Sequence, residues 1–173
     1  MRILALIGAL AILVAIGAAV FFFGGFYSVA GTEQDPAIIA SALIHIRQAS
    51  ISRHASAVPS ISLDDPAVVQ AGARAFAMRG CVNCHGGPGV KWAKFSEGLN
   101  PGPPDLKEVV GGLEAGEIFW VVKNGIKMTG MPSFGPIGVP DQEIWSIAAF
   151  LKKLPSLSDQ DYKTWTASLP GTN

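Results

Sequence analysis

The chain has 173 residues, and its 13 basic and 13 acidic residues balance to a formal net charge of zero. Nucleic-acid-binding domains normally carry a clearly basic face, so this balance argues against a nucleic-acid partner. Hydrophobic residues make up 49% of the chain. They are most concentrated at the N-terminus, which points to contact with a membrane.

The N-terminal segment contains no charged residue between Ile3 and Thr32. A membrane-spanning helix needs about 20 apolar residues, whereas a cleavable signal peptide has an apolar core of about 7–15. We therefore expect residues 1–30 to form an uncleaved transmembrane signal-anchor helix. The small residues Ser28-Val29-Ala30 leave cleavage open as the alternative.

The charges that flank this segment predict its orientation. Arg2 is the only charge before the apolar run and favours a cytoplasmic N-terminus. The chain from Glu33 onward would then lie on the outer side of the membrane.

Residues 31–63 read as a juxtamembrane helix and a linker. Asp35-Pro36 is a helix-start signal, and apolar residues follow it at helical spacing. We expect an amphipathic helix from Ala37 to about Ala49, then a serine-rich linker through Ser62. The apolar stripe of the helix is formed by Ile39, Leu43 and Ile46. Two roles fit this stripe, contact with the bilayer surface and contact with a partner subunit.

Residues 64–155 have the pattern of a compact helical domain, and residues 156–173 that of a tail. Three helices are expected, from Asp65-Pro66 to near Gly80, from Glu114 to Lys123 and from Asp141 to Lys153. Regions rich in Gly and Pro between them indicate loops. No alternation typical of strands is present, so we predict an all-α fold. Three modest helices bury little core, and an apolar cofactor would supply the missing interior. The tail carries apolar residues at Leu157, Tyr162, Trp165 and Leu169.

The segment Cys81–His85 reads Cys-Val-Asn-Cys-His, the attachment pattern for c-type haem. Cys81 and Cys84, three positions apart, can form thioethers to the two porphyrin vinyl groups. His85 then lies beneath the iron as an axial ligand. A structural zinc site needs four ligands, and the chain has no further cysteine. We therefore predict one covalently attached haem c.

Methionine and histidine are the candidates for the sixth iron ligand, because electron-transfer haems commonly pair His with Met. Met131 is favoured, since Pro132 biases it to an extended backbone and Gly130 permits close approach of the chain. Met128 is the second candidate, and His45 and His54 are weaker alternatives that precede the domain.

From about Asp65 to Pro155 the sequence resembles the class I cytochrome c domains of bacterial respiratory chains. The matching pieces are Gly72 and Phe76 before the Cys81–His85 motif, Gly102–Leu106, Asn124–Ile126, Gly130–Phe134 and the helix with Trp145. One extra residue between Phe76 and Cys81 departs from the family pattern.

The resemblance implies a location at a bacterial inner membrane, with the haem domain on the periplasmic face, and several residue roles. Pro104 would accept a hydrogen bond from His85 Nδ1, and Trp120 would pack near the haem or its propionates. The first and last helices of the domain would cross at Gly72, with Phe76 against Trp145.

The expected function is outer-sphere, single-electron transfer, without a small-molecule substrate and without enzymatic activity of the chain alone. The partners would be the membrane and redox proteins, as a fixed subunit of a larger membrane respiratory complex or as a carrier swinging on the Ser50–Ser62 segment. A haem-based sensor or weak peroxidase with a displaceable sixth ligand is the alternative. Four lysines are candidates for docking an acidic partner around the haem edge: Lys91, Lys94, Lys123 and Lys127.

Overall fold

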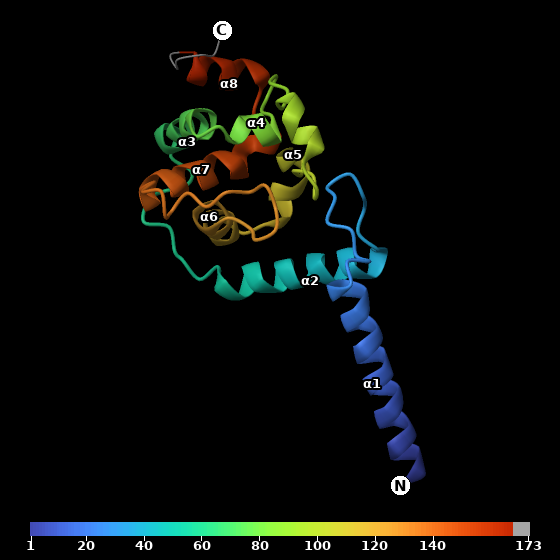
Figure 1. Cartoon of the computed structure of the whole chain (residues 1–173). Helices are drawn as coiled ribbons and strands as arrows, with labels where there is room; N and C mark the ends of the chain where they lie inside the picture. The colour runs from blue at the N-terminus through green and yellow to red at the C-terminus, as the bar shows by residue number, and fades with distance from the viewer. Residues whose placement is uncertain (168–173) are drawn as a thin grey trace. The chain divides into compact units, whose positions relative to one another are not determined.

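The computed structural model describes residues 1–167 of the chain (Figure 1). These residues form helices and loops without a strand, which confirms the predicted all-α class. Contacts divide the chain after Gln34 into two units, and each is described by itself.

The first unit is built on α1 (Arg2–Phe23), the helix expected in the apolar N-terminal segment. Its mean hydropathy over an 18-residue window is 2.9, and none of that window is buried by protein. Apolar side chains therefore cover α1 on all sides, so the helix is long and apolar enough to cross a membrane.

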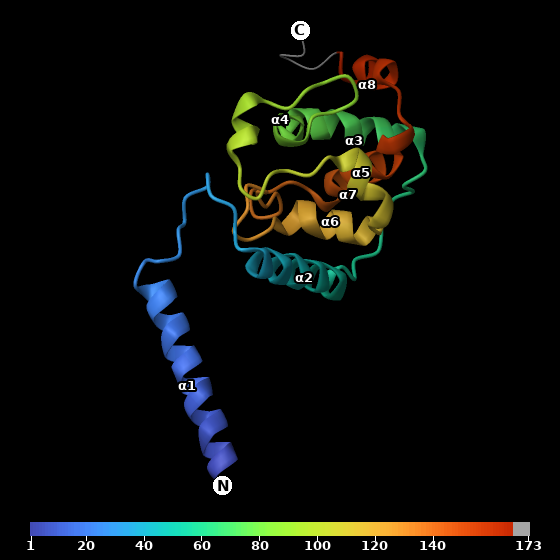
Figure 2. The ribbon, with the colours of Figure 1, turned by 90° about the vertical axis from the view of Figure 1, so that its right-hand side faces the viewer.

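The second unit stacks its helices in the order α8, α3, α7, α6 and α2 (Figures 1 and 2). The three predicted helices are α3 (Pro66–Met78), α6 (Ala115–Asn124) and α7 (Asp141–Lys153). Three short helices lie at the haem motif and in the loops, α4 (Cys81–His85), α5 (Leu106–Val109) and the 3-10 helix η1 (Lys94–Gly98). Two further 3-10 turns are η2 (Val110–Gly112) and η3 (Leu154–Ser156).

The core is organised around α7, which is buried from Ile144 to Leu151 because α3 covers one side and α6 another. The side chain of Asp65 caps α3 by accepting a hydrogen bond of 2.8 Å from the Ala67 N–H. At the crossing of α3 and α7, a Cβ on Gly72 would overlap the carbonyl oxygen of Ser146. The two backbones therefore approach as closely as glycine allows, as the resemblance implied.

The aromatic pairing at this crossing differs from the expected one. Phe76 packs on Phe150, with ring centroids 5.3 Å apart, whereas Trp145 stacks on Phe119 of α6 at 4.1 Å. Positions 145 and 150 point in different directions on one helix, because five residues correspond to about 500° of rotation. The predicted contact of Phe76 with Trp145 was therefore wrong.

The helix α2 (Ala37–His54) is longer than the predicted segment and belongs to the packed domain. Ile51 is 8% exposed, and Ser52 Oγ donates a hydrogen bond of 2.6 Å to Glu117 Oε1 on α6. The expected stripe is largely exposed, since Leu43 keeps 42% and Ile46 62% of its accessible surface. The segment from Ser50 to His54 is thus part of a docked helix, and the linker begins after it.

The segment predicted as a tail forms α8 (Asp159–Thr166), which packs on α3. Arg74 Nε donates a hydrogen bond of 2.9 Å to the carbonyl of Trp165. Tyr162 is 2% exposed and stacks on Phe150, with centroids 5.7 Å apart. The apolar residues of the tail are therefore covered by their own domain up to Ala167, whereas Leu169 lies outside the described residues.

The crossing at Gly72 generates a test of the core. We expect Gly72→Ala to lower the free energy of unfolding by about 3 kcal/mol, because the added methyl group meets backbone rather than a movable side chain. Gly111→Ala is the matched control, since a Cβ there meets nothing within 4 Å. Denaturant titration of the haem-loaded protein measures both, and equal stabilities for the two variants would contradict the close crossing.

Candidate haem site

The haem motif forms the short helix α4, which follows α3 after a tight turn. Gly80 opens the turn with φ of 76°, and Gly86 ends α4 with φ of 65°. Both values lie in the left-handed region that favours glycine. The two glycines thereby confine the motif to about one helical turn, directly after the helix that crosses α7.

Both cysteines of the motif are free thiols rather than a disulfide. Cys81 packs against the hydrophobic core. Burial raises the pKa of the Cys81 thiol to about 12. The Cys81 sulfur is therefore neutral and lies among apolar groups. Such surroundings would also bury the edge of a porphyrin.

His85 is held by the bond that the resemblance implied. Its Nδ1 lies 3.1 Å from the carbonyl oxygen of Pro104, so Nδ1 carries the proton and donates it to this bond. No described residue hydrogen-bonds to Nε2, which is left as the free ring nitrogen. Burial is the main cause that lowers the pKa of His85, and the Pro104 bond partly opposes it. A neutral imidazole with one nitrogen fixed is what an axial haem ligand requires.

The carbonyl of Pro104 is itself positioned by the next helix. Asp105 caps α5, and its Oδ1 accepts a hydrogen bond of 2.8 Å from the Lys107 N–H. Leu106, the first residue of α5, packs against the core. The loop that carries the hydrogen-bond acceptor of His85 is therefore anchored on its C-terminal side.

The two candidate methionines lie in different environments. Met131 is partly buried and packs against the core, whereas Met128 is 86% exposed. The Met131 N–H donates to Thr129 Oγ1 at 3.1 Å, and its carbonyl accepts from the Ile126 N–H at 3.3 Å. Hydrogen bonds of the Met131 backbone thus hold this residue against the core, whereas the side chain of Met128 is exposed to solvent. A Cβ added at Gly130 would lie 3.0 Å from the side chain of Leu99, so Leu99 is the close neighbour of this glycine.

The structure does not place Trp120, His54 or His45 beside the Cys81–His85 motif. Trp120 stacks on His54 of α2, with ring centroids 6.0 Å apart. His54 Nδ1 lies 2.8 Å from the carbonyl of Ser50, and His45 is exposed. Residues 1–167 contain no group of three or more His, Cys, Asp or Glu side chains arranged to hold a metal ion. A contact of Trp120 with haem remains a prediction.

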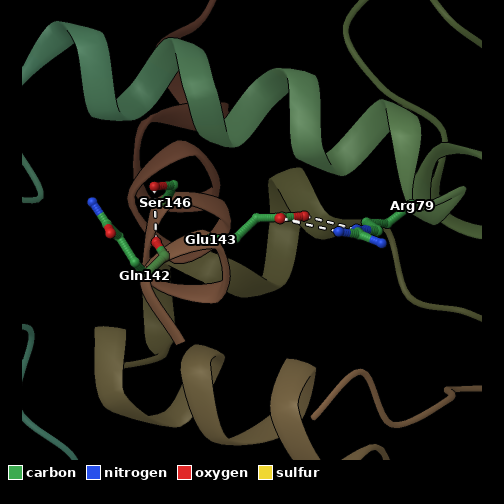
Figure 3. Close-up of polar contacts among 4 residues, drawn as sticks. All are labelled: Arg79, Gln142, Glu143 and Ser146. Atoms are coloured by element: carbon green, nitrogen blue, oxygen red, sulfur yellow. Dashed lines mark hydrogen bonds and ion pairs between the residues drawn. The ribbon is translucent and has the colours of Figure 1, made fainter. Parts of the chain in front are cut away.

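An ion pair that the sequence did not reveal ties the motif to α7 (Figure 3). Arg79, two residues before Cys81, binds Glu143 with two bonds, Nε to Oε1 at 2.7 Å and the second nitrogen to Oε2 at 3.0 Å. Such a forked pair fixes geometry, although a partly exposed pair contributes only about 0–1 kcal/mol. No local pattern reveals this pair, because Glu143 lies 64 residues after Arg79.

Tyr162 is a second residue near the motif whose place the sequence did not reveal. A Cβ on Gly87, two residues after His85, would lie 3.3 Å from its ring. Its hydroxyl is buried and has no hydrogen-bond partner among the described residues. Burial raises the pKa of Tyr162 to about 12, so the phenol stays neutral. The helix α8 therefore supports the chain just beyond the predicted iron ligand.

These residues fit a covalently bound haem. The thiols are free, one nitrogen of His85 is fixed while the other is available, and a half-buried methionine lies on a separate loop. These residues come from α4, from the loop before α5 and from the loop after α6.

Comparison with known protein families gives an independent result. Residues 67–151 match the family described as cytochrome C oxidase, cbb3-type, subunit III. No curated protein and no solved structure matches the chain. The matched region includes the motif Cys81–His85, Pro104 and Met131. Residues 67–151 are therefore a class I c-type cytochrome domain, which carries covalently bound haem c and serves in electron transfer.

Proposed function

We propose that this chain is a membrane-anchored monohaem cytochrome in which His85 and Met131 are the two axial ligands. The bond between His85 Nδ1 and the Pro104 carbonyl carries this proposal, because it aims the remaining nitrogen of a neutral imidazole. Cys81 and Cys84 attach the group as thioethers. When bound, the haem supplies a one-electron couple between Fe(II) and Fe(III).

Residues of the protein would set the reduction potential of this couple and keep other ligands away from the iron. A thioether ligand from Met131 favours the ferrous state, and a buried site raises the potential further. Met131 supports a closed sixth position, because the loop bonds at Thr129 and Ile126 hold it against the core. A closed position suppresses gas binding and peroxide chemistry. The sensor or peroxidase alternative requires this loop to release the ligand.

We further propose that the chain is a fixed subunit of a membrane oxidoreductase complex. The helix α1 would be the single-pass anchor, and the charge of Arg2 favours the haem domain on the periplasmic face. Docking of α2 on α6 argues against the hinge expected at Ser50–His54, since Ile51 and Ser52 are engaged there. The name of the matched family, an oxidase subunit, points the same way.

The ligand assignment is tested with one pair of methionine variants. We expect Met131→Leu to abolish the Fe(III)–sulfur charge-transfer absorbance of the oxidised protein and to open the reduced protein to carbon monoxide. Met128→Leu is the matched control and leaves both properties unchanged, because its side chain is 86% exposed. Rapid carbon monoxide binding by the unchanged reduced protein would favour the sensor or peroxidase alternative.

The role of α1 is tested by fractionation. We expect the full chain to stay in the membrane pellet after an alkaline carbonate wash. Replacing residues 1–34 by a cleavable secretory signal should release a soluble, haem-loaded protein, because α1 supplies the apolar length needed to span a bilayer. If the shortened protein stayed with the membrane, another surface would be the anchor.

The docked state of α2 is tested by two identical substitutions on one helix. We expect Ile51→Ala to lower the unfolding free energy of the full chain in detergent by about 2 kcal/mol, because Ile51 is 8% exposed. Ile46→Ala, at a position that is 62% exposed, should change it by less than about 0.5 kcal/mol. Trypsin cleavage at Arg47 and Arg53 should accelerate only in the first variant. Two neutral substitutions would restore a hinge within Ser50–Ser62.

A further inference from the structure

The helix α2 carries apolar side chains on two nearly opposite faces. On one face Ile51 is 8% exposed, because α2 packs on α6 there. The opposite face carries an apolar row at spacings of four, four and three residues, formed by Ile38, Ala42, Ile46 and Ala49. All four are exposed, Ile38 at 80% and Ile46 at 62%. These four residues are called the outer row below.

The contacts of α2 with α6 fix the side of the helix on which the outer row lies. Ser52 is hydrogen-bonded to α6, and the ring of His54 stacks on Trp120 with centroids 6.0 Å apart. The chain just after α2 is equally close, because a Cβ on Gly116 would lie 3.2 Å from the carbonyl oxygen of Ala55. These contacts hold the helix in one rotation about its axis, so the exposure of the outer row is a property of the fold.

The outer row lies at one end of the domain and is separate from the haem site. In the stack of helices, α2 is the last layer beyond α6, and α8 is the last layer at the other end (Figures 1 and 2). The haem motif follows α3, and both α7 and α6 lie between α3 and α2. A surface helix normally turns polar residues to the solvent. The outer row therefore indicates a cover that is neither this domain nor its cofactor.

The segment that leads into α2 is short. Aromatic residues are enriched at membrane–water interfaces, and Phe26 and Tyr27 come shortly after the end of α1. Residues 28–36 connect Tyr27 to α2, and even a fully extended chain of this length spans only about 35 Å. A turn at residues 31–32 shortens this reach. With α1 across the membrane, the first turn of α2 stays near the bilayer surface.

The charges of α2 are complementary to an anionic surface. The helix contains Arg47 and Arg53 and no acidic residue. Neither arginine forms an ion pair within residues 1–167. The acidic residues nearest in sequence, Glu33 and Asp35, precede the helix, and each already takes part in an interaction within the chain. Helices that lie on membranes combine an apolar face with basic residues, because anionic lipid headgroups attract Lys and Arg.

We propose that the outer row of α2 lies in the surface of the membrane that α1 anchors, with Arg47 and Arg53 beside anionic lipid headgroups. This inference rests on the proposed anchor. An interfacial helix buries its apolar face about 5–10 Å into the boundary between headgroups and acyl chains. Because α2 is also docked on α6, the membrane would hold the haem domain in one orientation, with α2 as its lowest layer and α8 farthest from the lipid.

Nitroxide labels on the haem-loaded full chain test this location. The chain has two cysteines, and both are used by the haem, so an added cysteine is the one free thiol. Ala42→Cys places the label in the outer row, and Gln160→Cys is the matched control at an exposed position of α8. Each labelled chain is placed singly in nanodiscs of phosphatidylglycerol and phosphatidylcholine. Electron paramagnetic resonance then measures collisions of the label with oxygen and with a polar nickel complex.

We expect the ratio of oxygen to nickel collisions to be about tenfold higher at position 42 than at position 160, because oxygen concentrates among acyl chains and the nickel complex stays in water. Nanodiscs of phosphatidylcholine alone should lower the ratio at position 42, since they do not attract the two arginines.

A charge in the outer row provides the second test. We expect Ile46→Glu to lower the ratio at position 42 about threefold, because an ionised carboxylate resists transfer into an apolar surrounding. Ile137→Glu is the matched control, at a position that is 69% exposed on the loop before α7, and it should leave the ratio unchanged. An unchanged haem spectrum in both variants shows that the fold is retained.

The other outcomes each overturn the inference in a recognisable way. Equal, water-like ratios at positions 42 and 160 in a chain that has entered nanodiscs would refute the membrane contact and leave the anchor standing. A label at position 42 that both reagents fail to reach would indicate cover by protein, a second copy in nanodiscs or a partner subunit if seen only in native membranes. A chain that did not enter nanodiscs would refute the anchor itself.

Discussion

The close crossing of α3 and α7 at Gly72 is the constraint on which the haem site depends. Because no side chain separates the two backbones, the C-terminal end of α3 has one position over α7, and the forked pair between Arg79 and Glu143 fixes it there. The motif Cys81–His85 begins two residues later. The thiols and the imidazole are thus positioned by helix packing, and the Pro104 carbonyl then sets the rotation of the ring.

Local signals in the sequence were sufficient to predict the central helices and the motif. Asp65-Pro66 marked the start of α3, and periodic apolar residues marked α7 at its observed bounds. The haem motif is a contiguous pattern, so it needed no knowledge of the fold. Met131 is partly buried and Met128 is exposed, and the choice of Met131 as ligand stays a prediction. The observed neighbour of Gly130 is Leu99.

The features that the sequence did not reveal all depend on contacts between distant segments. The pairing of Phe76 with Phe150 follows from the angle at which two helices cross, which no local pattern contains. The extension of α2 to His54 depends on its packing against α6. The helix α8 belongs to the domain because Tyr162 packs against Phe150. These two helices flank the region matched by the family, so the domain is larger than the family pattern alone indicates.

The central claim is that one haem is attached through both cysteines of the motif, and mass spectrometry of the denatured protein tests it most directly. Trypsin cleaves after Arg79 and after Lys91, so the peptide from Gly80 to Lys91 contains the whole motif. The account predicts that this peptide carries the mass of one haem, bound through thioethers at Cys81 and Cys84. An unmodified peptide, or one that contains a disulfide between the two cysteines, would contradict it.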